Sequence, residues 1–216
     1  MARIGAAPLA AARVILRVPE IPMLAFALLM SPLALAVPKG YTEIKTTGGC
    51  TYFLGPEKPS GYAAVRAECH WDDVTAAELD ALLSKHADHD HYFSAVSASE
   101  VLGTEGDQVK VFQVHTAPGI SDREASLLYK RSVSGESITH SWQLGPTQVP
   151  PKEGRVTCAM DTGLWTLTPA PSGGAEVVYE LAYEPGGSVP TFVVRWCQSV
   201  GVVSIVEDFH NYALAH

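Results

Sequence analysis

Residues 183–190 read Tyr-Glu-Pro-Gly-Gly-Ser-Val-Pro and lead into an apolar run that reaches Tyr212. Residues 175–183 alternate between two faces, which is typical of a β-strand. The Pro-Gly-Gly triplet ends that strand, because proline cannot donate to a ladder and glycine admits turn dihedrals. Ser188 then suits a helix N-cap, and Pro190 suits a first-turn position. The stretch therefore predicts a strand, a tight turn and a helix.

The apolar run predicts one long helix over residues 191–212, a range without proline. Phe192, Trp196, Val200 and Val203 fall at three- and four-residue steps along a single stripe. Further apolar residues widen this surface on other sides of the helix. We therefore expect the helix to lie across other structure and to be buried over much of its girth.

The rest of the chain predicts strands on either side of one short helix. This helix spans residues 76–87 and follows a capped start that ends at Thr75. Strands are predicted at residues 49–54, 62–71, 96–102, 108–115, 124–132, 137–144, 154–160, 164–168 and 175–183. Two strands, a helix, a run of strands and a final long helix form an α+β order.

Three short motifs resemble those of START (steroidogenic acute regulatory-related lipid transfer) domains. Residues 184–190 resemble the family's Asp-Pro-Gly-Gly-x-x-Pro segment before an apolar terminal helix, with Glu184 in place of the aspartate. Residues 121–124, Ser-Asp-Arg-Glu, resemble its x-Asp-Arg-Asp element before a strand. Cys-His-Trp at residues 69–71 stands where the family's second strand gives way to its first helix.

The resemblance implies a helix-grip fold from about Tyr41 to the end of the chain. In this α+β fold a curved antiparallel β-sheet wraps around a long C-terminal α-helix and encloses a hydrophobic cavity. The sequence departs from the family in having no tryptophan at residues 86–93, unless Tyr92 or Phe93 takes its place. It also has Tyr129 where some animal members have an arginine.

Bulky apolar side chains recur on one face of consecutive predicted strands. In an ordinary sandwich they would fill the core completely. The resemblance instead implies that they line a tunnel under the terminal helix, with three tyrosines, His140 and Arg123 as its few polar contacts. The ligand-binding residues implied in this way are Tyr129, Trp142, Met160, Trp165, Tyr179, Leu181, Tyr183, Phe192, Trp196, Val200 and Val203.

We therefore expect a noncatalytic carrier that binds a single hydrophobic ligand, lipid or sterol-like, without a cofactor. Release would require movement of the terminal helix or of the loop at residues 116–121. We expect a monomer that makes transient membrane contact. The alternative is an enzyme of the helix-grip superfamily that acts on an apolar substrate. A carrier returns its ligand intact, whereas an enzyme changes it.

Composition and motifs argue against several other functions. Hydrophobic residues make up 47% of the chain and charged residues 18%, which indicates a folded core. A net charge of −8 without a basic cluster argues against nucleic acid as a partner. The sequence has no G-x-S-x-G elbow, phosphate-binding glycine loop or dinucleotide fingerprint. Asp-Thr-Gly at residues 161–163 resembles a retroviral-type protease signature, but its position predicts a turn between two strands.

The densest polar cluster is His-Ala-Asp-His-Asp-His at residues 86–91. Imidazole and carboxylate groups are competent zinc ligands, so an exported metal-binding protein that depends on His89 and His91 is a third hypothesis. The spacing matches neither a zincin helix nor a zinc finger. A solvated loop after the first helix is therefore the preferred interpretation, without a metal site.

Residues 1–36 predict a secretory signal peptide. Three arginines precede an apolar stretch at residues 23–36 that ends in Ala-Leu-Ala, although Glu20 and Pro22 depart from the usual pattern. Cleavage after Ala36 would leave residues 37–216 as the lipid-binding domain, exported to the periplasm or secreted. An uncleaved membrane anchor or a misassigned start codon is the alternative.

Export would permit disulfide bonds between the chain's four cysteines. A hairpin centred on residues 59–60 places Cys50 opposite Cys69 and Tyr52 opposite Ala67. The two cysteines are then either bridged across the strands or buried as free thiols.

Overall fold

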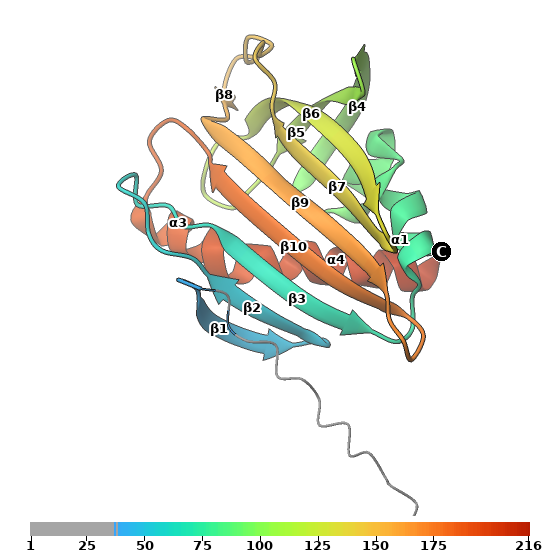
Figure 1. The fold of residues 1–216 in the computed structure, drawn as a ribbon. Coiled ribbons are helices and arrows are strands. Elements are labelled where there is room, and N and C mark those ends of the chain that lie inside the picture. Colours follow the sequence, from blue (N-terminus) through green and yellow to red (C-terminus); the bar gives the residue numbers. More distant parts are fainter. Residues whose placement is uncertain (1–36, 38) are drawn as a thin grey trace, which may run out of the picture. The chain divides into compact units, whose positions relative to one another are not determined.

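A computed structural model describes residue 37 and residues 39–216, and the predicted signal peptide lies outside these described residues. A ten-stranded sheet wraps around the C-terminal helix, so the predicted helix-grip α+β fold is confirmed (Figure 1). The sheet order is β1-β2-β3-β10-β9-β7-β6-β5-β4, and its neighbouring strands are antiparallel, whereas β8 pairs with β6 in parallel. The strands are β1 Thr42–Thr47, β2 Cys50–Leu54, β3 Val65–Trp71, β4 Val96–Glu105, β5 Gln108–His115, β6 Arg123–Ser134, β7 Ser137–Leu144, β8 Val156–Thr157, β9 Met160–Pro169 and β10 Ala175–Glu184.

The opening hairpin has the predicted register. β2 pairs with β3 so that Cys50 faces Cys69 and Tyr52 faces Ala67, and the two cysteines form a disulfide bond. β1 was not predicted. It lies at the edge of the sheet, and five of its six residues are exposed, so its sequence has no buried face to produce alternation.

The first helical segment is shorter than the predicted helix at residues 76–87. α1 (Ala76–Leu83) begins at Thr75, whose side chain forms a reciprocal capping box with Glu78. A 3₁₀ turn, η1 (His86–Asp88), and one helical turn, α2 (His89–Tyr92), follow. α1 packs against β9, β10 and the C-terminal helix.

The terminal helix has the predicted extent but is not one continuous α-helix. It consists of α3 (Thr191–Trp196), a π-helical turn η2 (Cys197–Gly201) and α4 (Val202–Ala215). Pro190, rather than the predicted Ser188, is the N-cap. In the widened turn the Val202 N–H donates to the Cys197 carbonyl, five residues back.

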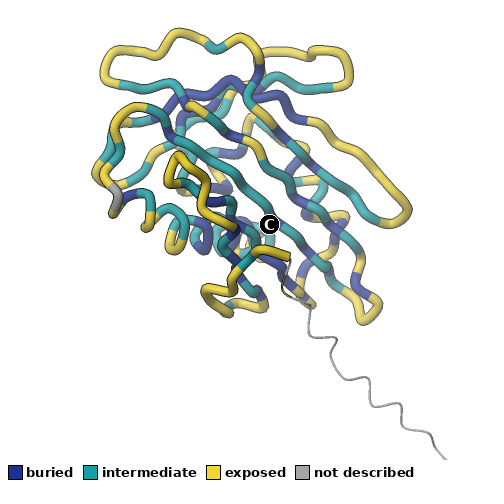
Figure 2. The backbone as a smooth tube through the Cα atoms, turned by 60° about the vertical axis from the view of Figure 1, so that its left-hand side comes forward, coloured by how far each residue is buried: buried dark blue, intermediate teal, exposed yellow. Residues whose placement is uncertain are grey.

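The core lies between the inner face of the sheet and α4, and buried residues follow the sheet and the inner side of the helix (Figure 2). Val206 and Phe209 of α4 are fully buried. The Phe209 ring centroid lies 5.0 Å from that of Trp165 on β9 and 5.7 Å from that of Phe93. This aromatic cluster anchors the C-terminal half of the helix through hydrophobic burial.

Asp161, Thr162 and Gly163 lie inside β9, so the predicted turn at residues 161–163 is wrong. Asp161 pairs with Tyr183 of β10, and Gly163 pairs with Trp142 of β7. An added Cβ at Gly163 would collide with the Trp142 ring, which explains the glycine in mid-strand. The sequence looked like a turn because this glycine makes room for a cross-strand ring.

Candidate functional site

A cavity of about 580 Å³ lies between the inner face of the sheet and the N-terminal half of the terminal helix. Its walls come from β3, β5, β6, β7, β9 and β10, from the segment after α2, from the loop at residues 116–121 and from residues 185–205. Most of the lining side chains are apolar or aromatic. Seven of the predicted ligand-binding residues lie on this wall: Tyr129, Trp142, Trp165, Tyr179, Leu181, Tyr183 and Trp196.

Four other predicted ligand-binding residues lie off the cavity wall. Phe192 and Val200 are 69% and 50% exposed, so the predicted stripe of the helix faces outward over these positions. Val203 is buried in the core cluster, and Met160 lies half-buried beside Lys58. The π-turn changes the phase of the helix between Val200 and Val203, which separates residues that α-helical spacing would place together.

A different face of the helix lines the cavity. Apolar residues surround this helix, and periodicity is weak where most positions are apolar, so the sequence does not indicate which side meets the sheet. The helix residues on the cavity wall are Val193, Val194, Trp196, Cys197, Gln198, Gly201, Val202, Ser204 and Ile205.

Arg123 lines the cavity, but its guanidinium donates hydrogen bonds to backbone carbonyl groups. It donates to the carbonyl oxygens of Ser121, Pro185 and Gly186, so it links the loop before β6 to the Pro-Gly-Gly turn. Gly186 and Gly187 in this turn have φ angles of 70° and 63°, which favour glycine. Arg123 therefore positions two segments of the wall.

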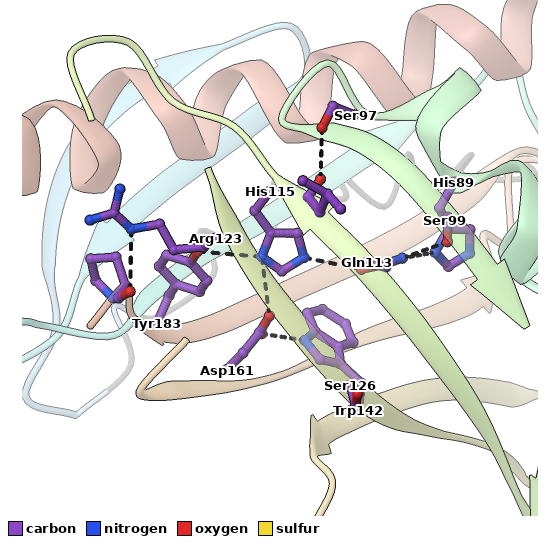
Figure 3. A network of polar contacts seen from close by, with 12 residues as sticks. His89, Ser97, Ser99, Gln113, His115, Arg123, Ser126, Trp142, Asp161 and Tyr183 are labelled. Atoms are coloured by element: carbon purple, nitrogen blue, oxygen red, sulfur yellow. Dashed lines mark hydrogen bonds and ion pairs between the residues drawn. The ribbon is translucent and has the colours of Figure 1, made fainter. Parts of the chain in front are cut away.

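A buried polar network crosses the cavity wall from α2 to β9. His89 is 3% exposed, and its Nε2 lies 3.2 Å from the Leu83 carbonyl. Gln113 Nε2 lies 3.1 Å from His89 Nδ1, and Gln113 Oε1 lies 3.2 Å from His115 Nε2 (Figure 3). Gln113 Oε1 also accepts from the Tyr129 hydroxyl at 3.3 Å.

The network ends at a compact group of three side chains on β5, β9 and the segment between β8 and β9. His115, Cys158 and Asp161 each offer one ligand-type atom, and these atoms lie within 4.8 Å of one another. His115 Nδ1 is 3.7 Å from Asp161 Oδ2, and the Trp142 indole N–H donates to Asp161 Oδ1 at 2.7 Å. The Tyr183 hydroxyl lies 3.3 Å from His115 Nδ1.

Burial perturbs the ionisation of this group. Desolvation raises the pKa of Asp161 to about 7, and the hydrogen bond from Trp142 offsets only part of this rise. Desolvation lowers the pKa of His115 to about 4, so its ring is neutral at pH 7. Burial, with a smaller contribution from Asp161, raises the pKa of the Cys158 thiol to about 12.

The interpretation of residues 86–91 as a solvated loop is wrong. They form η1 and the first part of α2, and His89 is buried on the cavity wall, while His91 is exposed. His86 is half-buried, with its ring centroid 4.8 Å from that of Tyr129. The His86 and His89 rings lie side by side, with centroids 5.3 Å apart, whereas His91 is exposed, so the three histidines do not form one ligand cluster in the described structure.

His140 is buried and lines the cavity, as expected for a polar contact. Its Nε2 lies 2.7 Å from Asp80 Oδ1 of α1, and Arg131 pairs with the same carboxylate. Arg131 and then His140 lower the pKa of Asp80 against the opposing effect of burial. This pair fastens α1 to the sheet beside the cavity.

The fold is similar to those of several solved structures. The chain has a TM-score of 0.72 to the STAR-related lipid transfer protein of Xanthomonas axonopodis, with 21% identity over 81% of this chain and 98% of that one. It has a TM-score of 0.72 to human STARD10, with 15% identity over 82% of this chain and 74% of that one. The TM-score to the human StAR-related lipid transfer protein 5 is 0.67, with 14% identity over 82% of this chain and 89% of that one.

The sequence itself matches an uncharacterized protein of Pseudomonas aeruginosa at 25% identity over 165 residues, 74% of this chain and 80% of that one. No protein-family model matches the chain. Within the described part of the chain, none of the helices combines the length and apolar character needed to cross a bilayer.

Proposed function

We propose that this chain, whose fold is that of START domains, is a noncatalytic carrier that holds one hydrophobic ligand, lipid or sterol-like, in its cavity. The cavity itself is the observation that carries this proposal. A volume of about 580 Å³ suits one drug-sized molecule, and the mainly apolar wall with a few grouped polar atoms is typical of ligand sites. Burial of apolar ligand surface would contribute about 25 cal/mol per Å².

The similar structures support this proposal in one further way. Two of them are described as lipid transfer proteins, and their folds match this one with TM-scores of 0.72 and 0.67. A carrier also needs a route for its ligand. The loop at residues 116–121 and the turn before α3 both border the cavity, and Arg123 joins them. We expect the ligand to enter between these two segments.

The outward face of the helix supports transient membrane contact. Phe192, Trp196 and Val200 follow one another at four-residue steps, and their exposed fractions are 69%, 37% and 50%. Exposed apolar stripes of this kind mark surfaces that bind partners or membranes. Since this stripe lies on the segment that covers the cavity, a membrane bound there would meet the proposed entry route.

Export of the domain is supported by the Cys50–Cys69 disulfide, because such bonds persist in oxidising compartments. The proposed mature chain begins at Val37. N-terminal sequencing of protein from the extracytoplasmic fraction tests this directly, and a chain that begins at Met1 would contradict it.

The carrier proposal is tested by native mass spectrometry of the protein purified from its own source, followed by organic extraction. We expect one apolar molecule per chain, which rebinds to the emptied protein and is recovered unchanged. One observation favours the enzyme alternative: Asp161 has a pKa of about 7 on the cavity wall, a value suited to proton transfer. Recovery of a chemically altered ligand, with the change lost in Asp161→Asn, would replace the carrier by that enzyme.

A further inference from the structure

Three potential metal ligands of different chemistry meet where β5 and β9 face the cavity. They are His115, Cys158 and Asp161, which are separated in sequence by up to 46 residues and whose ligand atoms lie within 4.8 Å of one another. We propose that these residues form a binding site for Zn²⁺ or a similar borderline divalent ion. This inference goes beyond the carrier function and does not depend on it.

The hydrogen-bond network places the His115 lone pair toward the other two residues. The Leu83 carbonyl can only accept, so His89 Nε2 carries the proton and His89 Nδ1 accepts from the amide nitrogen of Gln113. Gln113 Oε1 must then accept from His115 Nε2. His115 Nδ1, the nitrogen on the side of Asp161, is therefore unprotonated and accepts from the Tyr183 hydroxyl at 3.3 Å, a bond that a metal ion would replace (Figure 3).

A second hydrogen bond of the Gln113 amide nitrogen fixes the same orientation. Ser99 Oγ lies 2.6 Å from the His86 carbonyl and donates to it, so it accepts from Gln113 Nε2 at 3.1 Å. Two backbone carbonyls thus fix one orientation of Gln113 and one tautomer of His115. Metal-binding histidines commonly have their second nitrogen held in this way by an outer hydrogen-bond partner.

Asp161 is also oriented for the site. The Trp142 indole donates to Oδ1 and leaves Oδ2 facing His115. Trp142 can occupy this position because Gly163 has no side chain to meet its ring. The carboxylate is 3% exposed and has no arginine or lysine among its hydrogen-bond or ion-pair partners in the described chain. A bound cation would supply the charge that this buried carboxylate lacks.

The donor set indicates the kind of ion. One imidazole nitrogen, one thiol sulfur and one carboxylate oxygen match the ligands of zinc, whose bonds of about 2.0–2.3 Å separate tetrahedral ligands by roughly 3.3–3.8 Å. For a nitrogen and an oxygen ligand the spacing is roughly 3.3–3.5 Å, so His115 Nδ1 and Asp161 Oδ2, at 3.7 Å, need only a small approach. Tyr183, whose hydroxyl lies beside both His115 and Cys158, borders the fourth position on the side of the cavity. Binding would displace the Cys158 thiol proton.

The test uses the untagged full chain, stripped of metal with a chelator and titrated with Co²⁺ and then with Zn²⁺ against a chromophoric chelator. We expect one Co²⁺ per chain with thiolate-to-cobalt charge-transfer absorption, which Zn²⁺ abolishes by displacement. Cys158→Ser should remove this absorption and weaken Zn²⁺ binding by at least about 100-fold, since a first ligand should matter at least as much as an outer partner. Cys197→Ser removes the chain's other free thiol and should leave the cobalt absorption and the Zn²⁺ affinity unchanged.

Replacing Trp142, which bonds to Asp161 but would not touch the metal, tests whether Zn²⁺ affinity depends on the orientation of that ligand. Trp142→Phe keeps an aromatic ring but removes the bond to Asp161, and we expect Zn²⁺ affinity to fall 10- to 100-fold. Circular dichroism establishes that each variant is folded, and if Cys158→Ser does not fold, His115→Gln decides in its place. Absence of stoichiometric Co²⁺ and Zn²⁺ binding to the wild-type chain would overturn the proposal. So would binding that survives Cys158→Ser but is lost in His91→Ala, because the metal would then lie at residues 86–91.

Discussion

Three valines on the terminal helix differ mainly in what surrounds them, and this permits a matched test of the cavity. Val193 is 2% exposed and borders the cavity, Val206 is fully buried in the core, and Val200 is 50% exposed on the outer face. Replacing each in turn with tryptophan adds about 90 Å³ of close-packed side-chain volume at three different places. Only Val193→Trp should compete with a ligand for space.

The expected effects follow from these surroundings. At Val193 the indole would occupy roughly one-sixth of the cavity of about 580 Å³, the space of about three methylene groups of a ligand. At about 0.8 kcal/mol for each methylene, the lost burial is about 2.4 kcal/mol, or roughly a 50-fold weaker affinity. The free energy of unfolding should change by less than about 1 kcal/mol, because the ring enters open space.

The two other variants serve as controls. Val206→Trp should lower the free energy of unfolding by about 1–3 kcal/mol through overpacking, and Val200→Trp should change it by no more than about 0.5 kcal/mol. Titration with a fluorescent lipid measures affinity, and urea denaturation measures stability. Wild-type lipid affinity in a folded Val193→Trp protein would refute the reasoning, as would equal loss of affinity in Val200→Trp.

Three further predictions concern the packing of the core, the disulfide bond and the dependence of stability on pH. Phe209→Ala should lower the free energy of unfolding by about 3–5 kcal/mol in urea denaturation, because the ring is fully buried, and a loss under about 1 kcal/mol would contradict the packing described. Non-reducing peptide mapping should recover Cys50 linked to Cys69, and alkylation of both after unfolding without reductant would exclude the bond. Burial lowers the pKa of His89 to about 3, so the unfolded chain binds this proton first and stability falls as the pH drops from about 6.5 toward 3. His89→Gln should flatten this slope by up to about 1.4 kcal/mol per pH unit, and an unchanged slope would show that His89 does not contribute.

Local sequence patterns predicted much of the fold because they report directly on local structure. The alternating strand, the Pro-Gly-Gly triplet and the apolar run predicted β10, its turn and the terminal helix. Symmetry about residues 59–60 predicted the hairpin register that brings Cys50 to Cys69. The edge strand β1 was missed because it has no buried face.

The cavity was predicted less well than the fold. Strand residues such as Tyr179 lie on the cavity wall because two-residue alternation separates the faces of a strand, whereas Met160 lies off it because β9 continues through the predicted turn at residues 161–163. The predicted ligand-binding residues Phe192 and Val200 lie on the outer face of the helix, which the sequence does not reveal because apolar residues surround the helix and a π-turn shifts its phase. The meeting of His115 with Asp161 depends on the order of strands in the sheet, which local patterns do not encode.

The contacts of Arg123 have a kinetic consequence. One buried guanidinium bonds to carbonyls of two different segments, so displacing either segment alone leaves some of its N–H groups without an acceptor. An unpaired buried polar group costs about 1–3 kcal/mol, which disfavours every half-open arrangement. We therefore expect cooperative opening, because displacement of both segments would expose the guanidinium to water, which replaces the lost acceptors. Ligand should leave such a protein in a single all-or-none event, with a dissociation time course that fits one exponential.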